Sequence, residues 1–226
     1  PTDGIVAWLV DWNASFELGF TASRGNTETM NLRAAFNAGK EDDHHRWKLD
    51  SSYYYGSDSS STTKNEFTAG VLKDWLIPDS PWFYFADGRY EYDQFESWDH
   101  RVSGHGGLGY ELIKNDDVSL LLRGGAGASK EFGGDEDDIR PEALFGGEFN
   151  WQITDSQSLE ATTYIYPDLS DLGEARITST LGWKLKLDDF DGIGIKFGVA
   201  NEYETQVDEG VDHNDLKIFA SLVIDF

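Results

Sequence analysis

The stretch SWDHRVSGH, residues 97–105, combines serine, aspartate and histidine side chains that could catalyse hydrolysis. Such chemistry needs a nucleophile, a base and a group that orients the base, all within hydrogen-bond reach. In an extended chain, Asp99, Ser103 and His105 share one face and His100 lies on the other, and successive side chains on one face are about 6–7 Å apart. A neighbouring strand would have to complete the set, and we find neither a nucleophile elbow nor a lipase-type motif. We therefore predict that the chain is not an enzyme and keep a hydrolase as a minor alternative.

Three acidic runs are candidate cation ligands: GGDEDD at 133–138, LDDFDG at 187–192 and DEGVDHND at 208–215. Carboxylate clusters can hold Ca²⁺ or Mg²⁺, although the runs lack the spaced ligands of an EF-hand loop. The weak metal candidates are Asp135, Glu136, Asp137 and Asp138. Because runs of like charge more often form solvated loops, we predict no cofactor and keep Ca²⁺ or Mg²⁺ as the weaker alternative.

Composition narrows the functional classes. The chain has 226 residues, a net charge of −24 and no cysteine. The lack of cysteine excludes disulfides, thiol catalysis and zinc–thiolate sites. Nucleic acid is not expected as a partner, because phosphate binding needs a basic surface. The sequence also lacks the apolar run of about 18 residues that a transmembrane helix requires.

The elements that would position these side chains are strands. In NASFELGFTAS, residues 13–23, Phe16, Leu18 and Phe20 share one face and small or polar side chains occupy the other. Period-two alternation of this kind predicts a strand with one apolar face. About twelve such segments begin near residues 12, 28, 45, 64, 81, 100, 117, 140, 158, 174, 192 and 214. They would form a single domain over 1–226, with a short segment at 1–10 before the first strand.

The connections alternate in length. The even-numbered ones are mostly short, with PDS at 78–80, KND at 114–116 and TDSQ at 154–157. Most odd ones are longer and polar: GSDSSSTT at 56–63, FGGDEDD at 132–138, PDLSDLGE at 167–174 and ETQVDEGVDHND at 204–215. The exceptions are RGN at 24–26, which is tight, and KEDDHH at 40–45, which is longer. Short turns on one rim and long loops on the other are typical of a bacterial outer-membrane barrel.

We therefore predict an all-β fold, a 12-stranded antiparallel up-and-down transmembrane barrel with short periplasmic turns, longer extracellular loops and both termini in the periplasm. A β-sandwich and a lipocalin-like barrel of about eight strands fit less well. Aromatic residues favour the membrane interface and should form a periplasmic girdle of Trp12, Trp47, Trp75, Trp82, Trp151 and Phe226.

The segment FELGFTASRGNTETMNLRAAFNAGKEDDHHRWKLDSSYYYG at 16–56 resembles the opening of the salt-induced outer membrane protein family, a domain of unknown function. The motif is a strand, then Ser23, Gly25, Asn26 and Thr27, then a second strand; HRVSGHGGLGYELI at 100–113 also resembles the family. The resemblance implies an outer-membrane location and no established activity or catalytic residue. The final strand, ending on Phe226, also resembles the signal that the barrel-assembly machinery reads in outer-membrane proteins.

If the apolar faces meet lipid, the charged side chains face the lumen. The predicted lumen and constriction residues are Glu17, Arg33, Asp87, Arg89, His105, Arg123, Glu148, Arg176 and Lys196. All of these residues except Arg176 and Lys196 should lie near the middle of the barrel's height. A ring of both signs could filter small hydrated solutes, or its salt bridges could plug the barrel, because the strand count lies between those of filled and open barrels.

A basic group on the last three strands could also pair with carboxylates on the eighth and ninth strands or guide anions. The basic group is Arg176, Lys184, Lys186, Lys196 and Lys217, and the carboxylates are Glu142, Glu148 and Glu160.

The function that we predict is passive diffusion of small hydrophilic solutes or ions through a narrow, mixed-charge channel in the bacterial outer membrane. The alternative is a plugged structural or binding barrel that interacts with lipopolysaccharide or a protein partner, and an outer-membrane lipid hydrolase is less favoured. The expected partners are outer-membrane lipid and lipopolysaccharide, the barrel-assembly machinery and small solutes.

Overall fold

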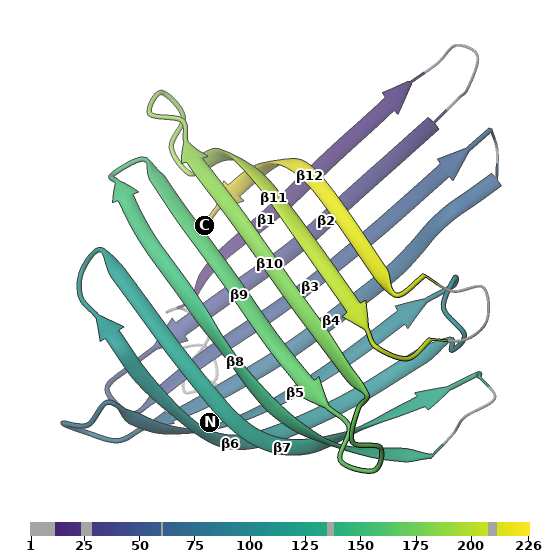
Figure 1. Cartoon of the computed structure of the whole chain (residues 1–226). Coiled ribbons are helices and arrows are strands. Elements are labelled where there is room, and N and C mark those ends of the chain that lie inside the picture. The colour runs from purple at the N-terminus through teal and green to yellow at the C-terminus, as the bar shows by residue number, and fades with distance from the viewer. Residues whose placement is uncertain (1–11, 24–28, 60, 135–137, 208–211) are drawn as a thin grey trace, which may run out of the picture.

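The computed structural model describes residues 12–23, 29–59, 61–134, 138–207 and 212–226, which form one closed antiparallel barrel (Figure 1). Each strand pairs with its neighbours in the chain, and β1 pairs with β12 to close the sheet. The strands are β1 (Asn13–Ser23), β2 (Thr29–Glu41), β3 (His45–Asp58), β4 (Ser61–Leu76), β5 (Trp82–Asp93), β6 (His100–Lys114), β7 (Val118–Phe132), β8 (Ile139–Thr154), β9 (Gln157–Pro167), β10 (Ala175–Lys186), β11 (Ile193–Glu204) and β12 (Asn214–Asp225). The predicted twelve-stranded fold is confirmed.

One predicted loop is wrong. The segment 56–63 was expected to be a long outer connection, but β3 continues to Asp58 and β4 begins at Ser61. The two strands stay paired through Asp58 and Ser61, across a register shift between Gly56 and Ser57. Backbone pairing therefore outweighs the low strand propensity of this serine-rich segment, because each ladder residue satisfies its donor and acceptor.

Most of the remaining described connections follow the expected division. Short turns at 42–44, 115–117 and 155–156 lie on the rim that also carries the C terminus, and the longer segment 168–174 lies on the other rim. The connection 187–192, on the rim of the C terminus, is as long as 94–99 on the other rim. The predicted segment at 1–10 and the RGN turn at 24–26 lie outside the described residues. In the described part of the chain, no helix is long and apolar enough to span a membrane.

Burial in the barrel is the reverse of that in a soluble protein. On β12, Ile218 is 77% exposed on the outer face, whereas Ser221, on the inner face, is 3% exposed. Leu216, Leu222 and Ile224 are also exposed on the outer face. Polar side chains turned inward and apolar ones outward are what a strand in lipid requires.

The last residue completes the closure of the barrel. The backbone N–H of Phe226 donates to the carbonyl of Ala14 at 2.9 Å, and the Phe226 carbonyl accepts from the N–H of Ala14 at 3.0 Å. The Phe226 ring is 70% exposed. The terminal aromatic thus contributes backbone pairing to the seam and an apolar ring to the outer face.

Glycines on β6 and β7 make room for aromatic rings inside the barrel. A Cβ on Gly109 would lie 2.1 Å from the Phe83 ring, and one on Gly125 would lie 2.4 Å from the Gly106 carbonyl oxygen and 3.0 Å from the Phe85 ring. The glycine-rich stretches at 104–109 and 124–127 therefore mark close approach, as glycine within strands often does.

Candidate functional site in the barrel lumen

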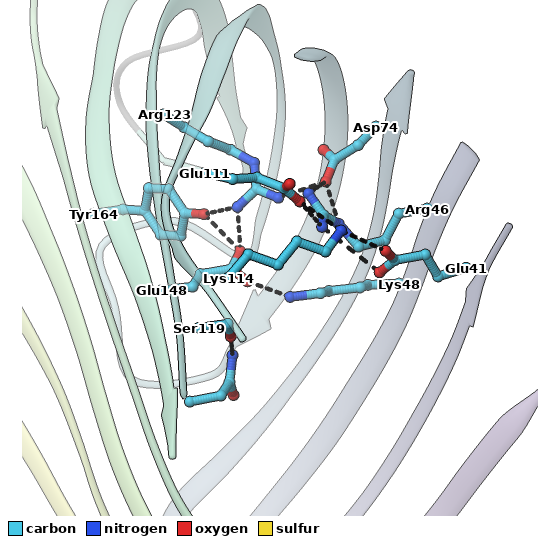
Figure 2. A network of polar contacts seen from close by, with 11 residues as sticks. Glu41, Arg46, Lys48, Asp74, Glu111, Lys114, Ser119, Arg123, Glu148 and Tyr164 are labelled. Atoms are coloured by element: carbon cyan, nitrogen blue, oxygen red, sulfur yellow. Dashed lines mark hydrogen bonds and ion pairs between the residues drawn. The ribbon is translucent and has the colours of Figure 1, made fainter. Parts of the chain in front are cut away.

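The lumen near the periplasmic rim is crossed by a network of ion pairs centred on Asp74 (Figure 2). Asp74, on β4, is 0% exposed. Its Oδ2 accepts hydrogen bonds from Arg46 Nε at 2.7 Å and from Arg123 Nη2 at 2.8 Å. Arg46 Nη1 also donates to Glu111 at 3.0 Å. Because Arg46 comes from β3, Asp74 from β4, Arg123 from β7 and Glu111 from β6, the network ties together strands that are not adjacent.

Glu148, on β8, extends this network across the barrel. It contacts Arg123 and also Lys48, which reaches it from β3 (Figure 2). The hydroxyl of Tyr164 donates to its Oε1 at 2.8 Å. We call Arg46, Lys48, Asp74, Glu111, Arg123, Glu148 and Tyr164 the Asp74 network.

A second set of cross-lumen pairs lies toward the outer rim. Arg101, on β6, donates to Glu131 at 2.9 Å and reaches β11, where it donates to Glu202 at 3.1 Å and Glu204 at 2.7 Å. Arg176, on β10, approaches Glu91, on β5, at 3.7 Å. We call Glu91, Arg101, Glu131, Arg176, Glu202 and Glu204 the Arg101 network.

An apolar cluster occupies the wall between the two networks. Phe83, Phe85, Leu121, Leu144 and Tyr166 are buried against one another. These side chains belong to β5, β7, β8 and β9, so packed side chains fill the lumen beside this part of the wall.

The predicted lumen residues fall into separate groups. Glu17 accepts from Arg33 at 2.5 Å and from Lys196 at 3.0 Å on the β1–β2–β11 side. His105 lies between two carboxylates: Nδ1 is 3.0 Å from Asp87 and Nε2 is 3.0 Å from Glu142. Both ring nitrogens are therefore engaged by carboxylate oxygens, an arrangement that leaves neither nitrogen facing a hydroxyl nucleophile.

Asp50 and Arg89 form the most accessible pair of opposite charge at mid-strand. Arg89 Nη2 donates to Asp50 Oδ2 at 3.2 Å, and the side chains are 37% and 43% exposed, respectively. Gly70 lies on β4, between β3 and β5, and is the cross-strand partner of both Asp50 and Arg89. A Cβ on Gly70 would lie 2.6 Å from Asp50 Oδ1. Since both side chains point into the barrel, the surface that they expose faces space inside the barrel.

The basic group expected to pair with β8 and β9 has mostly other partners. Lys196 contacts Glu160 as expected. Lys184 instead pairs with Asp225 at 2.6 Å, and Lys217 pairs with Glu66 at 2.5 Å and with Asp215 at 2.7 Å. The barrel brings β12 next to β11 and β1, so carboxylates on these strands and across the lumen neutralise the lysines.

The prediction omitted Asp74, the most buried charged side chain of the lumen. Period-two alternation along β4 could have found it, because Asp74 lies on the same face as Glu66, Thr68, Gly70 and Leu72. Arg46 was missed in the same way, two residues before Lys48. No local sequence pattern indicates which side chains Asp74 and Arg46 contact across the lumen.

The predicted girdle residues Trp12, Trp47, Trp75, Trp82, Trp151 and Phe226 all lie beside the periplasmic rim. Trp75, Trp82 and Trp151 are exposed on the outer face. Lys73 Nζ lies 4.4 Å from the Trp47 ring centroid and 4.8 Å from that of Trp75. This geometry suits a membrane interface, and the girdle role stays a prediction.

The weak metal prediction is not tested. Asp135, Glu136 and Asp137 lie outside the described residues, and Asp138 is exposed before β8. Among the residues that the structure does describe, no group of three or more histidine or acidic side chains is arranged to hold a metal ion.

In the described parts of the outer loops, Glu96 and Asp168 have pKa values shifted in opposite directions. Burial and the neighbouring carboxylates of Glu204 and Asp93 raise the pKa of Glu96, in the outer β5–β6 loop, to about 7. Hydrogen bonds from Ser170 and from the Asp171 backbone lower the pKa of Asp168, although its burial opposes this shift. The outer mouth therefore contains a carboxyl whose charge changes near neutral pH.

The model of one protein family matches residues 16–226. The chain belongs to this family, described as "Protein of unknown function, DUF481". Membership in a family of unknown function with an outer-membrane barrel fold confirms that part of the predicted resemblance, and the salt-induced designation stays a prediction. The comparison with curated proteins gave no match.

Solved outer-membrane barrels resemble this DUF481 chain in fold. The NanC porin structure is 12% identical, with 94% of this chain and 98% of that chain covered and a TM-score of 0.53. An outer membrane channel from Pseudomonas putida F1 is 9% identical, with 95% and 94% covered and a TM-score of 0.48. The translocator domain of the autotransporter NalP from Neisseria meningitidis is 12% identical, with 94% and 86% covered and a TM-score of 0.46. The closed barrel and its apolar exterior identify this chain as a bacterial outer-membrane protein.

Proposed function

We propose that this barrel is a channel for passive diffusion of small hydrophilic solutes or ions through a narrow, mixed-charge lumen. The observation that carries the proposal is the exposure of Asp50 and Arg89, at 43% and 37%, on inward faces in the middle of β3 and β5. Accessible charges at this depth would line a wet passage beside the packed apolar cluster. The porin named among the structural neighbours agrees with this proposal.

The filtering mechanism would be electrostatic and steric. A solute passing Asp50 and Arg89 meets both charge signs, so an ion of either sign has an attractive partner and a repulsive one. The filled wall of Phe83, Phe85 and Leu144 restricts the width of the passage. Selectivity of this kind needs no covalent chemistry, and the engagement of both His105 nitrogens by carboxylates supports the prediction that the chain is not an enzyme.

A plugged structural or binding barrel is the second candidate. It is favoured by the cross-lumen pairs of the Asp74 and Arg101 networks, in which Arg123 has 1% of its side chain exposed. Buried ion pairs are costly to break because they leave an uncompensated charge. Such pairs would hold opposite walls together and could close the lumen.

Single-channel conductance of the purified, folded protein in a planar bilayer tests the first candidate against the second. We expect steady current steps under a salt gradient. Asp50→Asn removes a negative charge from the passage and Arg89→Gln removes a positive one, so the two variants should shift the reversal potential in opposite directions. No current from an inserted barrel would favour the plugged barrel. Identical reversal potentials in both variants would show that Asp50 and Arg89 do not line the passage.

We propose two partners besides solutes and lipid. The exposed Phe226 ring and its pairing with Ala14 support recognition of the last strand by the barrel-assembly machinery, and the outer rim would contact lipopolysaccharide. Phe226→Ala should lower the fraction of folded barrel in cells, measured by heat-modifiable gel mobility. The matched control is Ile224→Ala, which also removes apolar surface from the outer face of β12. Equal folded fractions in both variants would contradict a special role of the terminal residue.

The salt-induced designation is a proposal about expression. Transcript levels should rise when cells are moved to higher NaCl concentration, and equal levels at all salt concentrations would contradict it.

A further inference from the structure

The outer mouth of the barrel forms an acidic vestibule. Asp93, Glu96, Glu202, Glu204 and Asp212 line this cavity, together with Trp98. Among the described residues, the basic side chains that line it are Lys217 and His213. The lining comes from β5, the β5–β6 loop, β11 and the β11–β12 loop, so carboxylates surround the cavity from several sides.

Some of these carboxylates are already neutralised. Glu202 and Glu204 accept hydrogen bonds from Arg101. Lys217 forms ion pairs with Glu66 and Asp215 at the edge of the cavity. The vestibule still carries excess negative charge, because Asp93, Glu96 and Asp212 have no ion-pair partner within 4.0 Å in the described part of the chain. The pKa of Glu96, raised to about 7 by burial and by neighbouring carboxylates, is the response expected of a carboxyl in such a negative field.

A buried carboxylate oxygen at the floor of the vestibule lacks a hydrogen-bond partner. Glu91 lines the cavity and is 6% exposed, and its Oε2 has no hydrogen bond among the described atoms. The nearest cations are Arg176 Nη1 at 3.7 Å and Arg101 Nη1 at 4.0 Å, both beyond hydrogen-bond distance. A buried acceptor without a donor is costly, so a ligand that brings an N–H donor would satisfy it.

The lining suits an organic cation better than a bare metal ion. The described residues contain no group of acidic and histidine side chains arranged around a metal, so the carboxylates are spread rather than convergent. The guanidinium of Arg101 lies 4.2 Å from the Trp98 ring centroid, so a cation over an aromatic face is already part of this wall. An alkylammonium group offers the same charge, several N–H donors and an apolar chain.

We propose that the outer vestibule binds amine-bearing organic cations, and that it gives the channel a preference for cationic solutes. The second part of the proposal rests on the proposed channel function. The first part requires only a folded barrel. Negative charge around a mouth raises the local concentration of cations and repels anions, which is the opposite of the anion-guiding track considered from the sequence.

Calorimetric titration of the full, folded chain in detergent tests the binding site directly. The probes are 1,4-diaminobutane, succinate and MgCl₂; the first two share a four-carbon chain and carry opposite charges. The Glu96→Gln/Asp212→Asn double variant removes two vestibule charges that have no ion-pair partner among the described residues. Its matched control is Asp188→Asn/Asp189→Asn, which makes the same charge change in the exposed β10–β11 turn on the periplasmic rim.

We expect 1,4-diaminobutane to bind and succinate not to bind. The vestibule variant should bind the diamine about tenfold more weakly, since each exposed charge pair contributes a modest factor, and the control should bind as the wild type does. Equal binding of succinate, tighter binding of Mg²⁺ that displaces the diamine, or equal diamine affinity in the two double variants would overturn the proposal.

Conductance measurements separate this proposal from the proposed function. A conducting barrel that does not bind the diamine would overturn the vestibule site and leave the channel standing. A silent barrel that binds the diamine with the expected loss in the vestibule variant would end the channel proposal and support the site as a ligand-binding mouth.

Discussion

Asp74 is the most buried charged side chain of the lumen in the described part of the chain. Its carboxylate is fully buried and neutralises two guanidinium groups, those of Arg46 and Arg123. Asp74→Asn would leave two buried cations facing a neutral amide. Losing one partner of a buried pair typically costs about 3–5 kcal/mol, so we expect a fall of this size in the free energy of unfolding, measured by urea denaturation in lipid vesicles with tryptophan fluorescence.

The matched control is Asp50→Asn, which makes the same chemical change at an accessible lumen carboxylate. Its pair with Arg89 is exposed, so the loss should stay below about 1 kcal/mol. Equal destabilisation by the two substitutions would mean that the Asp74 network is no more important to the fold than a solvated pair.

For single residues, the sequence predicts which way a side chain points but not which side chains it contacts. Alternation puts Glu17, Arg33 and Lys48 inside, and these residues do contact other inward side chains. The contact between Lys48 and Glu148 joins β3 to β8, and it depends on barrel width and strand stagger. No local pattern encodes either quantity, so the grouping of the lumen charges could not be predicted.

Strands β6 and β7 show how an element makes room for the lumen cluster. Gly125 faces inward, where a Cβ would meet the Gly106 carbonyl oxygen at 2.4 Å and the Phe85 ring at 3.0 Å. Its neighbour Gly124 faces outward, with Phe145 as the nearest contact at 3.7 Å. We expect Gly125→Ala to lower stability by about 1–3 kcal/mol, the usual cost of overpacking, and Gly124→Ala to have little effect in the same urea assay. The reverse order would contradict the packing assignment.

The β5–β6 loop should make the vestibule sensitive to pH. Glu96 faces Asp93 from β5, Arg101 from β6, and Glu202 and Glu204 from β11, and its pKa is raised to about 7. Because the folded carboxyl holds its proton more tightly than an unfolded one, its stabilising contribution is complete below the ordinary pKa of about 4.3 and is lost as the pH rises through about 7.

The vestibule therefore becomes more negative between pH 6 and pH 8. The affinity for 1,4-diaminobutane, which stays protonated in this range, should rise over the same interval in calorimetric titrations. Glu96→Gln should remove most of that rise. An affinity that is equally pH-dependent in wild type and variant would assign the titration to another group.

The positions of the strands were the most predictable part of the fold. Most strand starts match the alternation pattern closely, as for β3 at His45, β6 at His100 and β12 at Asn214. The failure came at β4, which begins at Ser61 inside a segment of serine and threonine expected to be a loop. Composition there indicates a turn, whereas pairing with β3 extends the ladder, and pairing is a tertiary effect that a local pattern cannot report.

The whole molecule combines a packed apolar cluster in the lumen with accessible charges at Asp50 and Arg89. The Lys48–Glu148 contact joins β3 to β8 across the lumen (Figure 2). If the barrel conducts, this cross-lumen contact narrows the passage. Lys48→Ala removes the side chain that reaches across, while Glu148 keeps Arg123 and Tyr164 as partners, so the barrel should still fold. We expect a larger single-channel conductance in a planar bilayer. Lys130→Ala, which removes a lysine from the outer face near Phe132, should leave the conductance unchanged. If Lys48→Ala conducts no better than this control, the contact does not limit the passage, and the width must be determined by the packed cluster of Phe83, Phe85 and Leu144 instead.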